Sequence, residues 1–307
     1  MKASDNARAA GAGLPNPVVA LPFLWRRMRG SLRFRPGAAP VVPFVREALE
    51  RNPAVTWVGH ATFYVRMDDA AFLTDPVYSE RASPFSFAGP RRLVPPGVPL
   101  EALPRLDLVL LSHDHYDHTD LPTVRRLAAR GVPFVVPTGL GDLVRRAGGS
   151  VAAELGWWQE ATVAGLRVTC VPARHFSGRG LGDRNRRLWA GFVVAGRKRR
   201  LYHSGDTALF DGFTEVRRRA GPIDLACLPI GAYDPRSLMG PIHLNPEGAV
   251  RAALDLDAGA TVGMHFGTFD LSDEPLDEPP RRFLTEARVR GIEARAVVMA
   301  IGETRGF

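Results

Sequence analysis

Cysteine is scarce in this chain of 307 residues, which contains only Cys170 and Cys227 and no C-x-x-C pair. A framework of disulfide bonds and a zinc site built from several thiolates are therefore excluded. Both cysteines lie in apolar segments of strand type. We expect them to be buried free thiols, as in proteins of the reducing cytoplasm.

Long hydrophobic runs and internal repeats are also lacking. No apolar run reaches the roughly 18 residues that a membrane-spanning helix needs. An export signal is not indicated either, because the positive charges near the N-terminus follow the apolar segment instead of preceding it. With 45% hydrophobic residues, the chain can bury the core of one large α/β domain. We expect a cytoplasmic protein, and the sequence does not indicate its oligomeric state.

Acidic residues are almost missing from the first 35 positions, where Asp5 is the only carboxylate. Seven basic residues there give a net charge of +6, which is most of the +8 of the whole chain. Glycine and proline are frequent in the same region, which is typical of irregular chain. We therefore predict a basic extension over residues 1–50 and a catalytic domain over residues 51–307.

Residues 18–35 combine apolar and aromatic side chains with a cluster of arginines. One interpretation is peripheral contact with the anionic inner face of a membrane, where each Lys or Arg contributes roughly 1 kcal/mol. The other is that Phe23, Leu24 and Trp25 pack on the catalytic domain while the arginines face water. Nucleic acid is not expected as a partner, because the arginines elsewhere are balanced by acids and form no stripe interleaved with aromatic residues.

The segment His113–His118, with sequence HDHYDH, carries the strongest chemical signal. It follows the apolar run Leu106–Ser112 and precedes a predicted helix with Pro122 in its first turn. Three imidazoles and two carboxylates in one loop are costly to bury unless a cation draws them together. The alternative is a solvated polar turn. Imidazole and carboxylate suit zinc, iron or manganese, so we predict a divalent metal site.

The H-x-H-x-D-H pattern resembles the signature of the metallo-β-lactamase superfamily. That resemblance implies two divalent metal ions, with zinc expected first and iron or manganese left open. It also implies that three later ligands follow strands in the order His, Asp, His, and His175, Asp206 and His265 meet this order. The implied first site is His113, His115 and His175, the second is Asp117, His118 and His265, and Asp206 bridges them. No cysteine is among these ligands, unlike the zinc-thiolate site of some β-lactam hydrolases.

Further blocks resemble the phospholipases D that hydrolyse N-acylphosphatidylethanolamine. They include Val55–Thr62, Phe72–Pro76, Leu228–Arg236 and His265–Phe269. The resemblance implies hydrolysis of an N-acylated phosphatidylethanolamine, or a related phosphodiester, to phosphatidic acid and an N-acylethanolamine. A lactone or carboxyl-ester hydrolase with the same metal centre is the first alternative. A metal-binding protein without catalytic activity is the second.

Six residues beside the ligands have candidate supporting roles. Asp75 is expected to hold the ligand loop by accepting hydrogen bonds, although an Asp before Pro is also typical of a simple turn. His60 is a candidate support or a packing residue, and His203 is expected to neighbour the site. His243 is a candidate substrate contact or acid for the leaving group. Tyr233 and Arg236 are candidate substrate contacts, since Arg suits bidentate binding of phosphate.

Strand-like and helix-like runs alternate along the rest of the chain, with more strands than a doubly wound sheet requires. Residues 55–67 form the first strand-like run, and Ala294–Ile301 the last. This pattern predicts an α/β protein with two mixed β-sheets packed face to face and helices outside. The resemblance implies the same four-layer αββα arrangement. The metal site should then lie along one open edge between the sheets.

Overall fold

The computed structural model describes residues 19, 22–23, 39–180 and 182–307. The membrane contact predicted for residues 18–35 therefore lies outside the described residues, except for Val19, Pro22 and Phe23, of which Phe23 is buried. Residues 39–50 lie against the main body. The Ala39 amide donates to the Gly267 carbonyl over 3.3 Å, and the Val42 amide donates to the Ile301 carbonyl over 2.9 Å.

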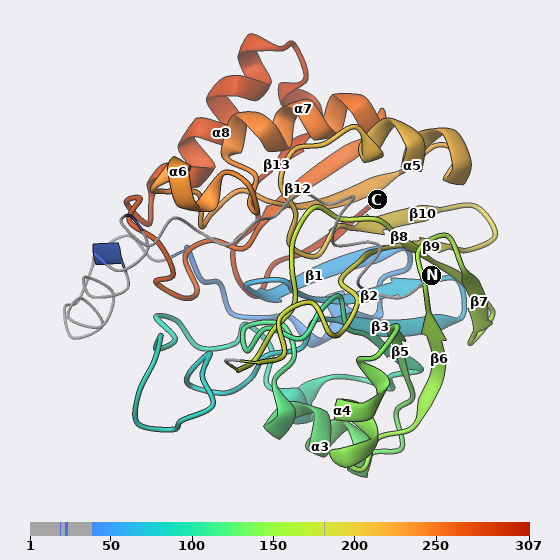
Figure 1. The fold of residues 1–307 in the computed structure, drawn as a ribbon. Helices are drawn as coiled ribbons and strands as arrows, with labels where there is room; N and C mark the ends of the chain where they lie inside the picture. The colour runs from blue at the N-terminus through green and yellow to red at the C-terminus, as the bar shows by residue number, and fades with distance from the viewer. Residues whose placement is uncertain (1–18, 20–21, 24–38, 181) are drawn as a thin grey trace.

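The described residues form two mixed seven-stranded β-sheets, packed face to face in the middle of the molecule (Figure 1). The first sheet has the order β14-β1-β2-β3-β4-β5-β6. Strands β3 to β6 are parallel, whereas β14, β1, β2 and β3 pair antiparallel. Its strands are β1 (Ala54–Gly59), β2 (Thr62–Met67), β3 (Ala70–Thr74), β4 (Leu108–Leu110), β5 (Phe134–Pro137), β6 (Val151–Leu155) and β14 (Thr304–Gly306).

The second sheet has the order β13-β12-β11-β10-β9-β8-β7. Strands β10 to β13 are parallel, and β7 to β10 are antiparallel. Parallel strands are covered on both faces and consist of nearly continuous apolar residues, as in the fully buried β11. Its strands are β7 (Glu160–Val163), β8 (Leu166–Val171), β9 (Gly191–Ala195), β10 (Arg200–His203), β11 (Leu225–Pro229), β12 (Ala260–Met264) and β13 (Ala296–Val297).

Helices cover the outer face of each sheet (Figure 1). The first sheet is covered by α3 (Leu121–Ala129) and α4 (Gly141–Arg146), and the second by α5 (Gly212–Ala220), α7 (Pro246–Leu256) and α8 (Glu278–Val289). The short elements are α6 (Arg236–Met239), η1 (Arg46–Glu50), η2 (Leu100–Ala102) and η3 (Glu293–Arg295). The expected four-layer αββα arrangement is confirmed. In the described part of the chain, no helix is long and apolar enough to cross a membrane.

The main core lies between the two sheets. Trp57 and Phe63 of the first sheet and Phe192 and Leu201 of the second belong to this core, and all four are fully buried. Each such side chain contributes roughly 1.5–3 kcal/mol through burial. Cys170 and Cys227 lie in the same core as free thiols, as predicted. A second core between the first sheet and α3 and α4 is likewise apolar. These two cores hold the strand ends in place.

The run of residues 55–67 is not one strand, as the sequence predicted, but a hairpin of β1 and β2. The chain reverses at Gly59 and His60, whose φ angles are 133° and 54°. Both strands are buried and therefore apolar, so the sequence pattern does not indicate the turn between them. The Thr268 hydroxyl accepts from the His60 amide over 2.8 Å. The turn therefore presents the His60 side chain at the edge where the other candidate residues lie.

Candidate metal centre

Strand ends place the candidate ligands at one edge of the two sheets. Asp75 follows β3, the HDHYDH loop follows β4, and Asp206 and His265 follow β10 and β12. His175 lies four residues after β8. Loops at one edge of a rigid sheet can converge on a common point although their sequence positions are far apart. Here they converge on the carboxylate of Asp206.

Four of the predicted ligands form a first group: His113, His115, His175 and Asp206. His115 Nδ1 lies 2.9 Å from His113 Nε2 and 3.2 Å from His175 Nε2. Asp206 Oδ2 lies 3.9 Å from His113 Nε2 and 3.8 Å from His175 Nε2. His113, His175 and Asp206 are buried, whereas His115 is partly open to solvent. The structure thus brings together the residues predicted for the first metal.

Hydrogen bonds on the far side of two rings show which nitrogens face the centre of this group. His113 Nδ1 lies 2.9 Å from Ser112 Oγ, which itself donates to Asp75 and must therefore accept from the ring. His175 Nδ1 donates to the Ile242 carbonyl over 2.9 Å. Both Nε2 atoms then present bare lone pairs toward His115. A neutral His115 can donate its one ring proton to only one of them, whereas a cation between the three nitrogens would bind all three. The distances of 2.9 and 3.2 Å from His115 Nδ1 are close to the roughly 3.3 Å edge of a tetrahedron around zinc. The donor set therefore fits a metal ion.

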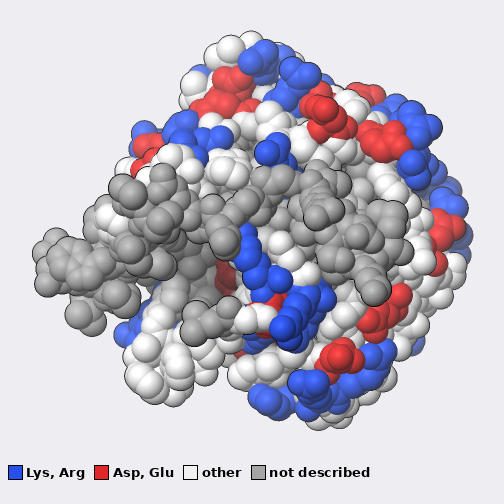
Figure 2. Space-filling view, in the orientation of Figure 1, with Lys and Arg blue, Asp and Glu red and all other residues white. Residues whose placement is uncertain are grey.

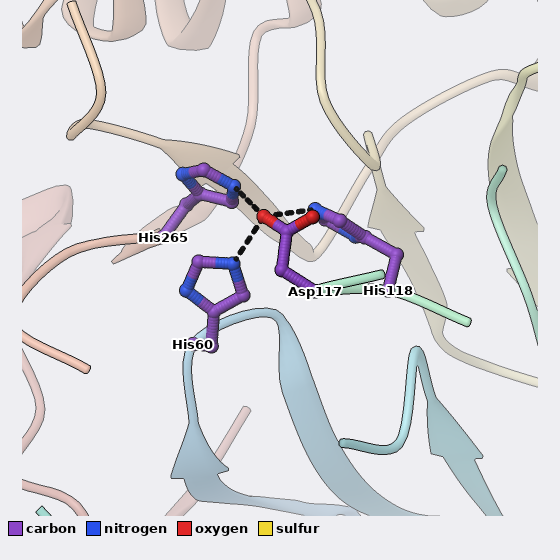
Figure 3. A group of neighbouring side chains, drawn as sticks. All are labelled: His60, Asp117, His118 and His265. Atoms are coloured by element: carbon purple, nitrogen blue, oxygen red, sulfur yellow. Dashed lines mark hydrogen bonds and ion pairs between the residues drawn. The ribbon is translucent and has the colours of Figure 1, made fainter. Parts of the chain in front are cut away.

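A second group contains Asp117, His118 and His265, together with His60. Figure 3 shows the Asp117 carboxylate between the three imidazoles. Its Oδ2 atom lies 3.0 Å from His60 Nε2, 3.3 Å from His265 Nε2 and 3.7 Å from His118 Nε2. The structure therefore adds His60 to the residues predicted for the second metal, as a direct neighbour of the Asp117 carboxylate.

Asp206 lies between the two groups. Its Oδ2 atom is 3.2 Å from both His118 Nε2 and His265 Nε2, in addition to its contacts with the first group. Asp206 Oδ1 and the Nε2 atoms of His118 and His265 are buried, and within the described residues they have no hydrogen-bond partner. Buried polar atoms are costly without partners. This placement is what a carboxylate shared by two metal ions requires.

Burial keeps the first group in the form that binds metal. It lowers the pKa of His113 well below its usual value, that of His115 to about 4 and that of His175 to about 3. These imidazoles are therefore neutral at pH 7. Burial also lowers the pKa of His265, but the Asp206 and Asp117 carboxylates outweigh it and raise that pKa to about 9. The proton on His265 balances the carboxylates, and a metal ion would displace it.

Asp75 holds this arrangement from behind and is completely buried. Its carboxylate accepts from the Ser112 amide over 2.7 Å, the Ser112 hydroxyl over 2.6 Å, His118 Nδ1 over 2.8 Å and His203 Nε2 over 3.1 Å. Burial alone would raise the pKa of Asp75, but the bonds from His118 and His203 bring it well below its usual value. A carboxylate partner of this kind fixes the tautomer of a metal-binding imidazole. It leaves His118 Nε2 free to face Asp206.

The three candidate substrate residues lie at different distances from the centre. His243 Nδ1 is 3.9 Å from Asp206 Oδ2, and its ring centroid is 5.0 Å from that of His175. Arg236 donates to the His243 carbonyl over 3.5 Å, so it lies behind His243. The Tyr233 hydroxyl donates to Glu278 over 2.6 Å, and its ring lies beneath Arg282. Only His243 among these three lies in direct contact with the ligand cluster.

Sequence reasoning did not single out the residues that brace the ligand loop. Asp114, inside the HDHYDH motif, accepts from the Gly178 amide over 2.7 Å and from Arg187 over 2.9 Å. Arg179 donates to the carbonyls of Asp114 and Thr119 over 2.6 and 2.8 Å. The loop after His175 is therefore tied to the loop after β4. In the sequence, only the charge of Asp114 within the motif could have indicated this bracing. Its partners could not be predicted, because they lie more than 60 residues away.

Comparison with known proteins agrees with this geometry. Residues 71–266 match the beta-lactamase superfamily domain. An uncharacterised protein of Mycobacterium tuberculosis is 44% identical over 275 residues, which cover 86% of this chain and 73% of that protein. The N-acyl-phosphatidylethanolamine-hydrolyzing phospholipase D 1 of Caenorhabditis elegans is 41% identical over 243 residues, covering 75% and 68%.

Among solved structures, the metallo hydrolase Igni18 of Ignicoccus hospitalis superposes with a TM-score of 0.63 at 23% identity. The superposition covers 83% of this chain and 97% of that one. This likeness supports the fold, and the family match extends over most of the catalytic domain. The chain therefore belongs to the beta-lactamase superfamily and is a metal-dependent hydrolase with the metallo-β-lactamase fold.

Proposed function

We propose that this hydrolase is a phosphodiesterase of the phospholipase D type, acting on N-acylphosphatidylethanolamine or a closely related phosphodiester. The observation that carries the proposal is the position of Asp206 between two groups of metal-binding side chains. Its support in sequence is the Caenorhabditis elegans relative, at 41% identity. In the proposed reaction, water oxygen bonds to phosphorus, the bond from phosphorus to the ethanolamine oxygen breaks, and that oxygen takes up a proton. The products are phosphatidic acid and an N-acylethanolamine.

His113, His115 and His175 would hold the first ion, Asp117, His118 and His265 the second, and Asp206 both. Two bound divalent ions would lower the pKa of a shared water and stabilise the entering and leaving oxygens of an in-line displacement. We propose zinc as the metal, with iron or manganese equally compatible with imidazole and carboxylate.

His243 is the residue that we propose to contact the substrate. Burial lowers its pKa to about 3, so its imidazole is neutral at pH 7 and can donate one hydrogen bond. The Nδ1 atom is buried without a partner in the described part of the chain. A neutral ring beside Asp206 can therefore bind a phosphoryl oxygen or the departing alcohol oxygen. Arg236, through its bond to the His243 carbonyl, helps to position this ring.

The test combines metal analysis with hydrolysis of defined substrates. Purified protein should contain two metal ions per chain and cleave bis(p-nitrophenyl) phosphate. It should also convert N-acylphosphatidylethanolamine to phosphatidic acid and N-acylethanolamine, as followed by mass spectrometry. Cleavage of a lactone panel without any phosphodiester cleavage would instead assign the carboxyl-ester alternative. Bound metal without turnover of either class would assign a binding role.

A further inference from the structure

A loop next to the metal centre carries two exposed phenylalanines. Phe85 and Phe87 are 55% and 79% exposed, and their ring centroids lie 5.5 Å apart. The loop of residues 79–92 extends from the body of the molecule at the lower left of Figure 1, drawn in cyan. In Figure 2 the same place is an uncharged bulge. Neighbouring large apolar side chains are rarely left in water without a binding partner.

Hydrogen bonds at its base hold this loop in one shape. Arg81 donates to the carbonyls of Ser86 and Gly89, over 3.1 and 2.7 Å. The Ala82 amide donates to the Pro90 carbonyl over 3.0 Å, and Arg81 pairs with Arg91 in an antiparallel β-bridge. These hydrogen bonds and the β-bridge therefore fix the loop in a shape that exposes the two phenylalanines.

Positive charge surrounds the base of the loop. Within the described residues no ion pair engages Arg81 or Arg125, and Arg125 is exposed, whereas Arg179 donates to backbone carbonyls near the Asp114 carboxylate. Two acids lie beside Arg81 and Arg125, and both have partners. Glu80 pairs with Arg91, and the buried Asp120 accepts from Ser79 and Thr123. The surface therefore combines an apolar tip with two arginines that belong to no ion pair, which suits an anionic lipid surface.

A pocket of about 480 Å³ lies under the loop and is bounded on one side by Tyr116 of the HDHYDH loop. Arg81, Phe85, Tyr116, Arg125 and Arg179 are among its lining residues. Tyr116 lies between the ligands His115 and Asp117 in sequence, and its ring stacks under the Arg179 guanidinium at 3.9 Å. A lipid held at the loop would therefore lie next to the ligand loop.

We propose that the loop of residues 79–92 docks the enzyme on an anionic membrane, with Phe85 and Phe87 inserted at the boundary of headgroups and acyl chains. The inference rests on the proposed function, because docking on a membrane serves catalysis only if the substrate is a phospholipid of that membrane. A protein partner is a weaker explanation. Two rings at the tip of a narrow loop offer far less than the roughly 800 Å² per partner of a stable protein interface, whereas insertion into lipid needs no matching surface.

The experiment measures sedimentation of the full chain with vesicles that contain no substrate. Phosphatidylcholine vesicles are compared with mixed vesicles of phosphatidylcholine and phosphatidylglycerol. The Phe85→Ser/Phe87→Ser variant should bind mixed vesicles at least about tenfold more weakly than wild type, because two large apolar side chains no longer insert. Arg125→Gln should weaken binding to mixed vesicles about fivefold and leave binding to neutral vesicles unchanged. High salt should remove the effect of Arg125→Gln but not that of the phenylalanines.

Val289→Ser is the matched control, because Val289 is an equally exposed apolar residue on α8, far from the loop (Figure 1). It should bind vesicles as wild type does. All variants should hydrolyse soluble bis(p-nitrophenyl) phosphate at the wild-type rate. If wild type itself did not hydrolyse this phosphodiester, the proposed function would be refuted, whereas the vesicle-binding test of docking would still stand. Unchanged vesicle binding by the double phenylalanine variant would overturn the docking inference. The inference would also be overturned if wild type were a dimer and the double variant were a monomer that still bound vesicles, because the phenylalanines would then serve a protein interface.

As a second readout, Phe87→Trp should be quenched by brominated lipids in mixed vesicles. A variant that binds vesicles but shows no quenching beyond that of wild type would place the loop outside the bilayer and would also overturn the inference.

Discussion

Replacing Asp75 with asparagine tests whether one buried carboxylate holds the histidines of the metal centre. Asparagine has nearly the same shape, so the change removes charge and one accepting oxygen without leaving a cavity. In the structure, Asp75 Oδ1 accepts from the Ser112 amide, and Oδ2 accepts from the Ser112 hydroxyl, His118 and His203. The less costly orientation of the amide keeps its oxygen on the side with three donors. Its NH2 group then faces the Ser112 N–H.

The expected cost follows from these contacts. One buried backbone donor loses its acceptor, which costs about 1–3 kcal/mol. The three remaining hydrogen bonds lose the assistance of the negative charge, at roughly 1 kcal/mol each. Relief from burying a charge offsets part of this sum. The free energy of unfolding should therefore fall by about 3–5 kcal/mol, and the metal affinity by about 10–100-fold, as for other lost partners of metal-binding histidines.

The difference in stability should also depend on pH in a defined direction. The pKa of Asp75 lies below its usual value of 3.8 in the folded protein, so the ionised carboxylate stabilises the fold above that value. This contribution is lost as the pH falls toward the lower folded pKa. Urea unfolding of metal-free wild type and Asp75→Asn should show a constant difference from neutral pH down to about pH 4 and a smaller one below it.

Asp257→Asn is the control for the same chemical change at the surface. Asp257 ends α7 in the left-handed region, which asparagine also tolerates, and forms exposed ion pairs with Arg217 and Arg295 over 3.4 and 3.6 Å. It should change the unfolding free energy by less than about 0.5 kcal/mol. If Asp75→Asn were as stable as this control and bound metal as wild type does, the Asp75 network would have no role in holding the site.

Other predictions concern the metals and the substrate contact. Asp206→Ala should reduce metal content and turnover together, because Asp206 contacts both groups of ligands; retention of two ions in elemental analysis would contradict the ligand assignment. His175→Ala should remove mainly the first ion, leaving about one ion per chain. Chelation should lower the melting temperature by roughly 10 °C, because the buried nitrogen and oxygen atoms of the site then lose the metal ions that they bind. Added metal should restore the melting temperature. His243→Ala should keep both ions but slow hydrolysis of the lipid by about 10–100-fold, and that of nitrophenyl esters much less, because the neutral ring no longer donates a hydrogen bond to the departing alcohol oxygen; equal losses would indicate a structural role.

Much of the candidate site could be predicted from the sequence because its signals are local. The HDHYDH segment places three imidazoles in six residues, and each later candidate follows an apolar run of strand type. Hydrophobic patterning also predicted two sheets with outer helices, which the structure confirms. Hydrophobic patterning did not predict the strands correctly where burial does not alternate along the chain. The hairpin at Gly59 and His60 was merged into one strand, and the half-exposed strands β6 and β7 were not predicted.

Only the tertiary structure decided which side chains touch. His60 and Asp117 are 57 residues apart, and His203 and Asp75 are 128 apart. Their contacts depend on the register of paired strands and on the packing of one sheet against the other, which local sequence does not encode. The same holds for Tyr233, whose hydroxyl turns to Glu278 on α8, and for the exposed tip at Phe85 and Phe87. The sequence by itself determined the metal chemistry, because ligand types lie in a motif. The fold decided which groups support it, because those contacts join segments distant along the chain.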